Sequence, residues 1–581
     1  MLPVSLFSAL RASLRDGYSG TAARQDVLAG LTVGTVAVPL SMALAIAAGV
    51  PPQHGLYTAI VAGAVAALSG GSRFNVTGPT AAFVVILFPI VAEHGLGGLL
   101  VATLMAGAIL VALGVGGMGR LIQFVPYPVV LGFTSGIAVV IAALQIPQFI
   151  GLGGGGGDGH LIGSLMDTGS SLGDWQPAAV AVGALALITL LLWPRLRSPV
   201  PAPLMGLAVG AVGAWLANHW LPGDGTGVAT VASEFQWEVG GKTGSGVPPA
   251  PPGVALPWKL AGADGQPLHV DFALIRDLAG PAFAIAMLAA IESLLCSVVA
   301  DGMTRTRHDA NGELIGQGLG NLAAPFFGGI TATAALARTA TNIRSGARSP
   351  VAGVTHALVV LLAMVALAPL LGLVPMSALA ALLFVVAWNM SEARHFVRML
   401  RSAPPGDIAV LVTCFGLTVF FDMVLAVAVG TGLAGALFIR RMALLTYADR
   451  VATTSGATAS LPPSTALYDI NGPLFFAAAE KALSTLHRID PGIRSVIVDM
   501  HDVPTMDATA IVSLRTLVED MHQRGIALIL VGLPGRIIVK LRRAGIRRSP
   551  GALGYCRGLD QAIATLRRWD HARSPEDGVA A

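Results

Sequence analysis

The sequence predicts a polytopic α-helical membrane protein of about fourteen transmembrane segments, followed by a small α/β domain. Of the 581 residues, 54% are hydrophobic and only 12% are charged, whereas a soluble domain carries about 25% charged residues. Four long stretches contain no Asp, Glu, Lys or Arg: 27–72, 121–157, 314–337 and 349–391. About 20 apolar residues cross a bilayer as a helix, so several of these stretches hold two spans. A membrane domain at 26–442 therefore precedes a domain of ordinary soluble composition at 443–581.

Arginine residues lie in short clusters between the apolar stretches, a pattern typical of cytoplasmic loops in membrane proteins. The Gly/Pro-rich segments 151–174 and 221–271 carry few basic residues and are predicted to lie outside. This assignment requires an even number of spans with both termini cytoplasmic, and it accounts for the net charge of +4 without a nucleic-acid partner. The clusters placed inside are Arg120, Arg195 and Arg197, Arg305 and Arg307, Arg344 and Arg348, Arg394, Arg398 and Arg401, and Arg440 and Arg441.

Residues 1–25 form an apolar patch followed by arginines, without a small-residue cleavage site, which favours a cytoplasmic lead-in over a signal peptide. The three cysteines, Cys296, Cys414 and Cys556, lie far apart and lack metal-ligand spacing. The sequence therefore predicts neither a disulfide framework nor a zinc site, and no metal or cofactor is expected.

Two spans carry internal breaks. The sequence is GGSRFNVTGPT at 70–80 and GGITATAAL at 328–336, in each case a Gly pair, a short β-prone stretch and small residues that open a helix. Interrupted segments at corresponding places in two halves indicate an inverted-repeat transporter with a midplane site. A helix that begins inside the membrane presents unpaired N–H groups and a partial positive charge, which suits an anion. The alternative is that the glycines only permit close helix packing.

Ionisable residues at membrane depth are candidates for function. Glu292 lies within an apolar helix with no basic residue within one turn. Burial favours its neutral form, so it is a candidate for proton binding or cation coordination, the alternative being a structural carboxyl. Arg338 lies two turns into the second broken helix. Three roles are open for it: attraction of an anion, a pair with Glu292, or a structural clamp. Arg73 is interpreted as an inside-facing anchor and Asp422 as a helix cap at the outer surface.

From residue 466 the pattern changes to strands that alternate with amphipathic helices, which predicts a small α/β sheet. This part contains no Gly-rich phosphate loop and no Cys/His cluster, so an enzyme is not expected and no catalytic residue is proposed. The predicted strands cover 466–470, 495–500 and 526–533, and the predicted helices cover 476–489, 508–521 and 536–546.

Several motifs resemble those of a known family. The stretches VPLSMALAIAAGVPPQHGLYTAIVAG and GGSRFNVTGPTAAFVV resemble the SulP (SLC26) anion transporters. In the tail, INGPLFFAAAEKAL and VIVDMHDVPTMDATA are similar to the STAS domain that these transporters carry. The resemblance covers almost the whole chain. It implies two inverted seven-segment repeats, a core domain that moves like an elevator against a gate domain, and usually a homodimer in the lipid bilayer.

The resemblance also implies positions for the site. The anion would lie between the starts of the two half-helices, near Arg338, with Glu292 at the family's acidic coupling position. Cys296 follows one turn later, where sodium-coupled relatives tend to carry a hydroxyl, so a thiol favours protons over sodium. The residues that the resemblance assigns to the substrate are Thr80, Ala81, Ala82 and Phe83 on one side and Thr333, Ala334, Ala335 and Leu336 on the other.

Within the family the motifs AIESLLCSVVADGMTRTRHDANGELIGQGLGNLAAPFFGGITATAALART and AWNMSEA are most similar to bacterial inner-membrane transporters of C4-dicarboxylates. Many relatives carry Gln where this chain has Leu40, so this chain lacks a polar group that favours sulfate-type recognition in those relatives. Phosphorylation is not inferred, because Ala508 follows Asp507 where soluble STAS proteins have a serine. Two other hypotheses remain: a bicarbonate or sulfate carrier, and a membrane sensor that signals to cytoplasmic protein partners through the STAS domain.

Overall fold

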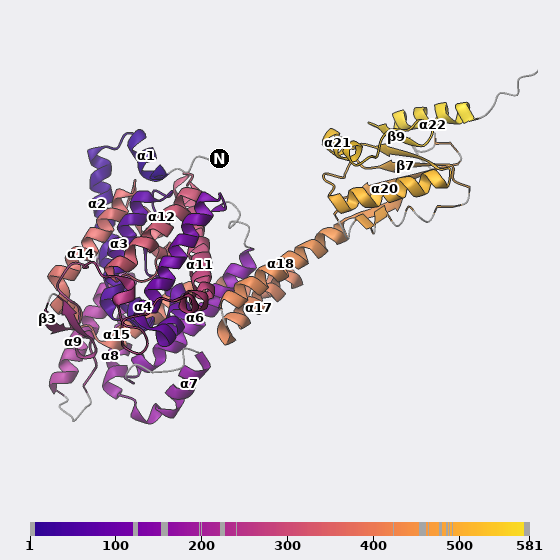
Figure 1. The fold of residues 1–581 in the computed structure, drawn as a ribbon. Helices are drawn as coiled ribbons and strands as arrows, with labels where there is room; N and C mark the ends of the chain where they lie inside the picture. The colour runs from indigo at the N-terminus through magenta and orange to yellow at the C-terminus, as the bar shows by residue number, and fades with distance from the viewer. Residues whose placement is uncertain are drawn as a thin grey trace, which may run out of the picture. The chain divides into compact units, whose positions relative to one another are not determined.

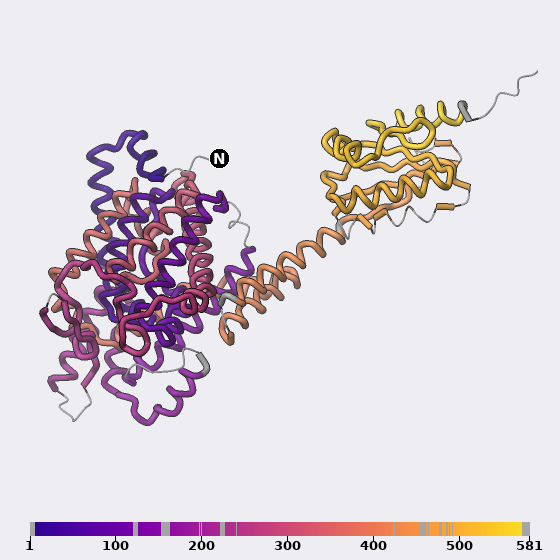
Figure 2. The backbone as a smooth tube through the Cα atoms, viewed as in Figure 1, coloured from indigo at the N-terminus to yellow at the C-terminus, as the bar shows by residue number. Residues whose placement is uncertain are grey.

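The computed structural model describes most of the chain (Figures 1 and 2). The chain divides into two compact units, 1–431 and 432–581, with the boundary inside the helix Met423–Leu445, and each unit is described separately below. The predictions for Arg120, Arg197 and Asp422 lie outside the described residues. The described residues are 6–119, 126–152, 161–196, 198, 200–220, 227–239, 241–421, 423–451, 461–462, 464–475, 479–480, 482–483, 486, 489–490 and 492–573.

The first unit is a helical bundle, and eight of the described helices are long and apolar enough to cross a membrane. Helix α4 is two helices, because Gly95 breaks it with φ 69° and ψ −174°. The helices are α1 (Ser8–Arg15), α2 (Gly20–Ala47), α3 (Pro52–Ser69), α4 (Ala81–Val115), α6 (Tyr127–Phe149), α7 (Leu161–Ser170), α8 (Pro177–Leu192), α9 (Ala202–Trp220), α10 (Val231–Glu234), α11 (Phe272–Thr304), α12 (Ala310–Ala323), α13 (Leu336–Arg344), α14 (Val351–Gly372), α15 (Met376–Met390), α16 (Ala393–Ser402), α17 (Pro405–Phe420) and α18 (Met423–Leu445).

The packing of these helices has the symmetry of two repeats. The described segments α2, α3, the two halves of α4, α6, α8 and α9 correspond in order to α11, α12, α13, α14, α15, α17 and α18. The contact of α2 with α14 then matches that of α11 with α4, and α3 with α14 matches α12 with α4. Likewise α6 packs on α17 as α15 packs on α8. The predicted fold of fourteen segments in two seven-segment repeats is confirmed.

The same contacts divide the bundle into two groups of helices. One group contains α2, α3, α4, α11, α12, α13 and α14, and it corresponds to the predicted core. The other contains α6, α8, α9, α15 and α17, and it corresponds to the gate. Glycines allow the core helices to approach closely. A Cβ on Gly107 of α4 would meet the carbonyl oxygen of Gly318 in α12 at 2.9 Å, and one on Gly316 would meet Gly70 at 2.4 Å.

Two pairs of short strands belong to the first unit. Strand β1 (Thr77–Gly78) pairs antiparallel with β4 (Thr333–Ala334), although 255 residues separate the partners Gly78 and Thr333 in the chain. Strands β2 (Gln236–Val239) and β3 (Lys242–Ser245) form a hairpin in the predicted outside segment. The β1–β4 pair lies where the sequence predicts the two breaks, so the breaks of the two repeats are brought into contact.

The second unit is a five-stranded sheet in the order β5-β6-β7-β8-β9, in which only the β5 edge strand is antiparallel. Its predicted strands and its helices after residue 500 are confirmed, whereas the predicted helix at 476–489 lies largely outside the described residues. The sequence did not predict β5, β9 or α22. The elements are β5 (Tyr447–Arg450), β6 (Thr465–Asn471), β7 (Ser495–Asp499), α20 (Ala508–Gln523), β8 (Ala527–Val531), α21 (Gly535–Arg543), β9 (Leu553–Cys556) and α22 (Leu559–Arg573).

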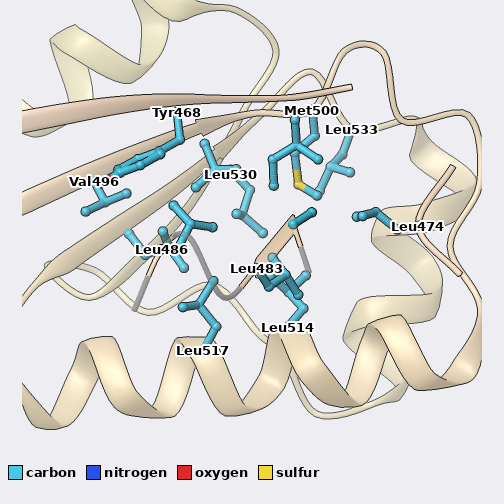
Figure 3. Packing of buried hydrophobic residues seen from close by; sticks show 14 of the residues in the cluster. Tyr468, Leu474, Leu483, Leu486, Val496, Met500, Leu514, Leu517, Leu530 and Leu533 are labelled. Carbon is cyan, nitrogen blue, oxygen red and sulfur yellow. The ribbon is translucent and has the colours of Figure 1, made fainter. Parts of the chain in front are cut away.

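Each face of this sheet buries its own hydrophobic core. In Figure 3, Leu514 and Leu517 of α20 point toward Val496 and Leu530 of the sheet. The opposite face packs on α22, where Leu566 is buried against Ile497 and other strand residues that point to this face. Because adjacent strand residues point to opposite faces, the continuous apolar runs of β7 and β8 supply both cores.

Candidate anion-binding site

The centre of the candidate site is the β1–β4 pair, in which Thr77 faces Ala334 and Gly78 faces Thr333. The pairing extends one residue further, because Ala335 N donates to Val76 O at 3.1 Å. Each strand leads directly into a half-helix, α4 after β1 and α13 after β4. The antiparallel pairing therefore brings the N-termini of two helices, one from each repeat, to the same place.

Neither half-helix is capped by a side chain at its N-terminus. The N-cap residue of α4 is Thr80, whose hydroxyl does not bond to the helix, and the N-cap of α13 is Ala335, which has no hydroxyl. The first N–H groups of a helix have no partner within the helix, and they carry the positive end of the helix dipole. Two uncapped N-termini at one place form an anion-binding arrangement.

Glu292 of α11 lies beside the first of these N-termini. Thr80 Oγ1 donates a hydrogen bond to Glu292 Oε2 at 3.3 Å, instead of capping its own helix. Thr80, Glu292 and Ala335 are partly accessible and Leu336 is exposed. The carboxyl predicted to couple transport thus contacts the predicted substrate residue Thr80 directly.

In the described part of the chain, Arg338 attracts Glu292 electrostatically but makes its hydrogen bond to another group. Its guanidinium is buried, and Nη2 donates to the carbonyl oxygen of Pro79 at 2.5 Å. Nε and Nη1 have no hydrogen-bond partner in the described part of the chain. A Cβ on Gly78 would lie 2.5 Å from Nη1, so the missing side chain at Gly78 makes room for the guanidinium. Arg338 therefore ties α13 to the residue that precedes the cap of α4, and it adds positive charge behind both helix ends.

Thr333 and Ala334 lie within β4 rather than at the helix start. Thr333 Oγ1 shares a hydrogen bond of 2.7 Å with Ser293 Oγ and lies 3.1 Å from Ala289 O, so its hydroxyl is already engaged by α11. Cys296 Sγ donates to Ala334 O at 3.3 Å. On the other side, the side chains of the first turn of α4 are buried, namely Ala81, Ala82 and Phe83. The groups that remain for an anion are thus the main-chain N–H groups at the starts of α4 and α13; Thr80 is partly accessible, but its hydroxyl already donates to Glu292.

The structure adds supporting residues that the sequence analysis did not select. Glu313 and Asp26 are buried carboxyls of the core helices. Asp26 Oδ1 accepts from Arg348 N at 2.6 Å, and Asp26 Oδ2 accepts from Ser349 Oγ at 2.5 Å, which joins α2 to the start of α14. The predicted anchor Arg73 forms an ion pair of 2.6 Å with Asp16. A signal for Glu313 existed in the sequence, because polar residues recur every fourth position after it.

Comparison with known proteins agrees with this architecture. The Sulfate permease family model matches residues 24–413, and the STAS domain model matches residues 458–556. "Putative sulfate transporter YvdB" of Bacillus subtilis is 38% identical over 91% of this chain and 95% of its own length. "Bicarbonate transporter BicA" of Picosynechococcus is 29% identical over 90% of each chain. The solved structure titled "The overall structure of SLC26A9" covers 98% of this chain and 94% of its own, with a TM-score of 0.79 and 18% identity. The chain therefore belongs to the sulfate permease (SulP, SLC26) family of anion transporters, as a multi-pass membrane protein with a C-terminal STAS domain.

Proposed function

We propose that this chain is a secondary active transporter of small organic anions, namely C4-dicarboxylates such as succinate or fumarate, coupled to protons. The observation that carries the proposal is the meeting of two uncapped helix N-termini beside one carboxyl, with Thr80 bonded to Glu292 at 3.3 Å. The core helices would carry the anion past the gate helices by an elevator motion. The proposed substrate contacts are the starts of α4 and α13, with Arg338 behind them.

The position of Glu292 suggests how a proton and an anion are coupled. When it is ionised, its negative charge lies at the positive end of α4 and repels an arriving anion. When it is protonated, that repulsion is removed, and the helix N–H groups are available to the substrate. Protonation on the acidic side of the membrane therefore favours loading, and loss of the proton on the other side favours release. Cys296 supports protons over sodium, because its thiol donates to a carbonyl rather than offering a hydroxyl oxygen to a cation.

The second candidate is a bicarbonate or sulfate transporter, and the names of the relatives favour it. The organic-anion proposal is supported instead by motifs that resemble those of the C4-dicarboxylate transporter DauA, and by Leu40 of α2. An apolar side chain at that position offers no hydrogen bond to a sulfate oxygen but is compatible with the methylene groups of succinate.

Uptake into proteoliposomes tests the proposal. Purified full-length protein is reconstituted, and labelled succinate, sulfate and bicarbonate are supplied with and without an inward proton gradient. Gradient-stimulated succinate uptake that sulfate does not inhibit is the expected result. Gradient-independent uptake of sulfate or bicarbonate, with no succinate uptake, would establish the second candidate. Protein that carries none of the three would favour the sensor hypothesis, in which the STAS domain signals to a partner.

The other segments of the chain have roles that follow from this function. Residues 26–442 would perform transport, 1–25 would be a cytoplasmic lead-in, and 443–581 would be a cytoplasmic domain that regulates transport or binds a cytoplasmic protein. The protein would lie in a bacterial inner membrane as a homodimer with both termini inside. The arginine clusters between the spans support this orientation.

A further inference from the structure

Helix α12 carries three buried polar side chains at successive turns, Glu313, Gln317 and Asn321, which we name the α12 polar ridge. Positions four residues apart lie on one face of a helix, and these three side chains are almost completely buried, at 2%, 1% and 0% exposure. A buried polar group is costly unless it forms hydrogen bonds. The partners of the ridge therefore reveal its role.

Glu313 accepts four hydrogen bonds, which matches the four acceptor sites of a carboxylate. Oε2 accepts from Gly71 N at 3.0 Å and from Ser72 N at 2.9 Å. Oε1 accepts from Asn75 Nδ2 at 2.7 Å and from Gln317 Nε2 at 2.9 Å. All of these donors except Gln317 belong to the loop that leads from α3 into β1. The carboxylate thus fixes the approach to the first half-helix.

The next residue of the ridge holds β1 itself. Gln317 Nε2 donates to Thr77 Oγ1 at 2.8 Å, and Thr77 lies three residues before the N-cap Thr80. Asn321 holds the other strand, because Oδ1 accepts from Ala332 N and Nδ2 donates to Ala332 O, both at 2.8 Å. One face of α12 therefore sets the position of both strands that precede the half-helices.

We propose that Gln317 is a positioning residue that sets the distance between the two half-helix N-termini and thereby the affinity for the transported anion. This inference rests on the proposed function, in which the anion binds between those N-termini. Gln317 does not touch the anion; it acts through Thr77. Helix N–H groups bind an oxygen well only at about 2.7–3.2 Å, so a small displacement of β1 weakens the contacts of one helix with the anion.

A double-mutant cycle on the full-length protein in liposomes or detergent tests this role. The variants are Gln317→Met, which keeps the approximate size but removes the hydrogen bonds, Thr77→Val, which removes the hydroxyl, and their combination. Ile315→Val is the matched control, because Ile315 is buried in the same helix but faces Gly114 of α4. For each protein the dissociation constants of succinate and of sulfate and the melting temperature are measured.

Gln317→Met and Thr77→Val are each expected to bind the transported anion about tenfold more weakly, on the order of the effect of one buried hydrogen bond. The double variant should be no weaker than Gln317→Met alone, because that change already removes the bond between Gln317 and Thr77 that Thr77→Val removes. The control should keep wild-type affinity even if its melting temperature falls by a similar amount. Wild-type affinity in Gln317→Met, or additive losses in the double variant, would overturn the inference. If the wild-type protein binds sulfate but not succinate, the proposed substrate is refuted but the role of Gln317 is not. The dissociation constants of sulfate for the same variants then test that role.

Discussion

Replacement of Glu292 by Gln should separate anion binding from proton coupling. Glutamine has nearly the same shape, and its carbonyl oxygen can still accept the hydrogen bond that Thr80 Oγ1 donates at 3.3 Å. The amide is neutral at every pH, so it resembles the protonated carboxyl. The variant should therefore keep the conformation that binds the anion, while losing the site that takes up and releases a proton.

In the described part of the chain, one carboxyl, that of Glu292, is bonded to the N-cap residue of α4. We therefore expect one proton to be carried per anion, which sets the size of the effect. One proton carried per anion allows an accumulation ratio of about tenfold for each pH unit across the membrane, because one unit corresponds to about 1.4 kcal/mol. With the membrane potential clamped at zero, wild-type liposomes should approach that ratio for labelled succinate. Liposomes with Glu292→Gln should level off near a ratio of one.

The assay compares gradient-driven uptake with counterflow on the same purified variant. Counterflow exchanges labelled for unlabelled succinate without net proton movement, so it should persist in Glu292→Gln and show that the protein is folded and binds substrate. Thr80→Val is a useful companion, because it removes the hydrogen bond but keeps the carboxyl and should retain coupling. Full gradient-driven accumulation by the Gln variant would refute proton coupling through Glu292. Loss of both activities with loss of folded protein would instead indicate a structural carboxyl.

Three further outcomes are expected. A chain that ends near Ala443 should retain succinate binding, because both half-helices precede that point; a well-folded truncated protein that does not bind succinate would contradict this. Leu514→Ala should destabilise the fragment 443–581 by about 3 kcal/mol in a denaturant titration, since Leu514 is fully buried and a core Leu→Ala change costs about 2–5 kcal/mol. The hydrogen bond from His501 to Asp499 raises the pKa of His501 above 6.5. Its stabilising effect should therefore be complete at pH 5 and decline as the pH rises through that raised pKa. The loss should be about 0.5 kcal/mol or less for this exposed pair, and His501→Gln should abolish it.

The sequence was sufficient to predict the two broken spans, because paired glycines followed by small residues stand out within charge-free apolar stretches. It also singled out Glu292, an isolated carboxyl in an apolar helix, whose role in coupling stays a prediction. It could not show that Thr80 is the hydrogen-bond partner of Glu292, because that depends on how the two repeats fold against one another. For Arg338 the sequence left an anion contact, a pair with Glu292 and a structural clamp open, and its bond to Pro79 O, for which Gly78 makes room, fits the clamp.

Buried polar residues close to loops were harder to recognise. Glu313 lies a few residues after Arg305 and Arg307, so its sequence surroundings resemble a cytoplasmic loop. The four-residue spacing of Glu313, Gln317 and Asn321 indicates one helix face, but the fold is needed to show that α12 begins at Ala310 and carries that face into the core. The strands β5 and β9 of the second unit were missed for a related reason. Each is only four residues long, and such short strands become recognisable only beside their neighbours.

The absence of side-chain caps on α4 and α13 has a consequence for how such a site can change over time. Its attraction for negative charge is supplied by peptide groups, which every residue type except proline retains at these positions. Under the proposed function, substitutions at Thr80 or Leu336 would therefore alter the size and polarity that a substrate encounters without removing the attraction itself. If the anion binds there as proposed, single substitutions around the helix ends should change which anion is preferred before they abolish binding.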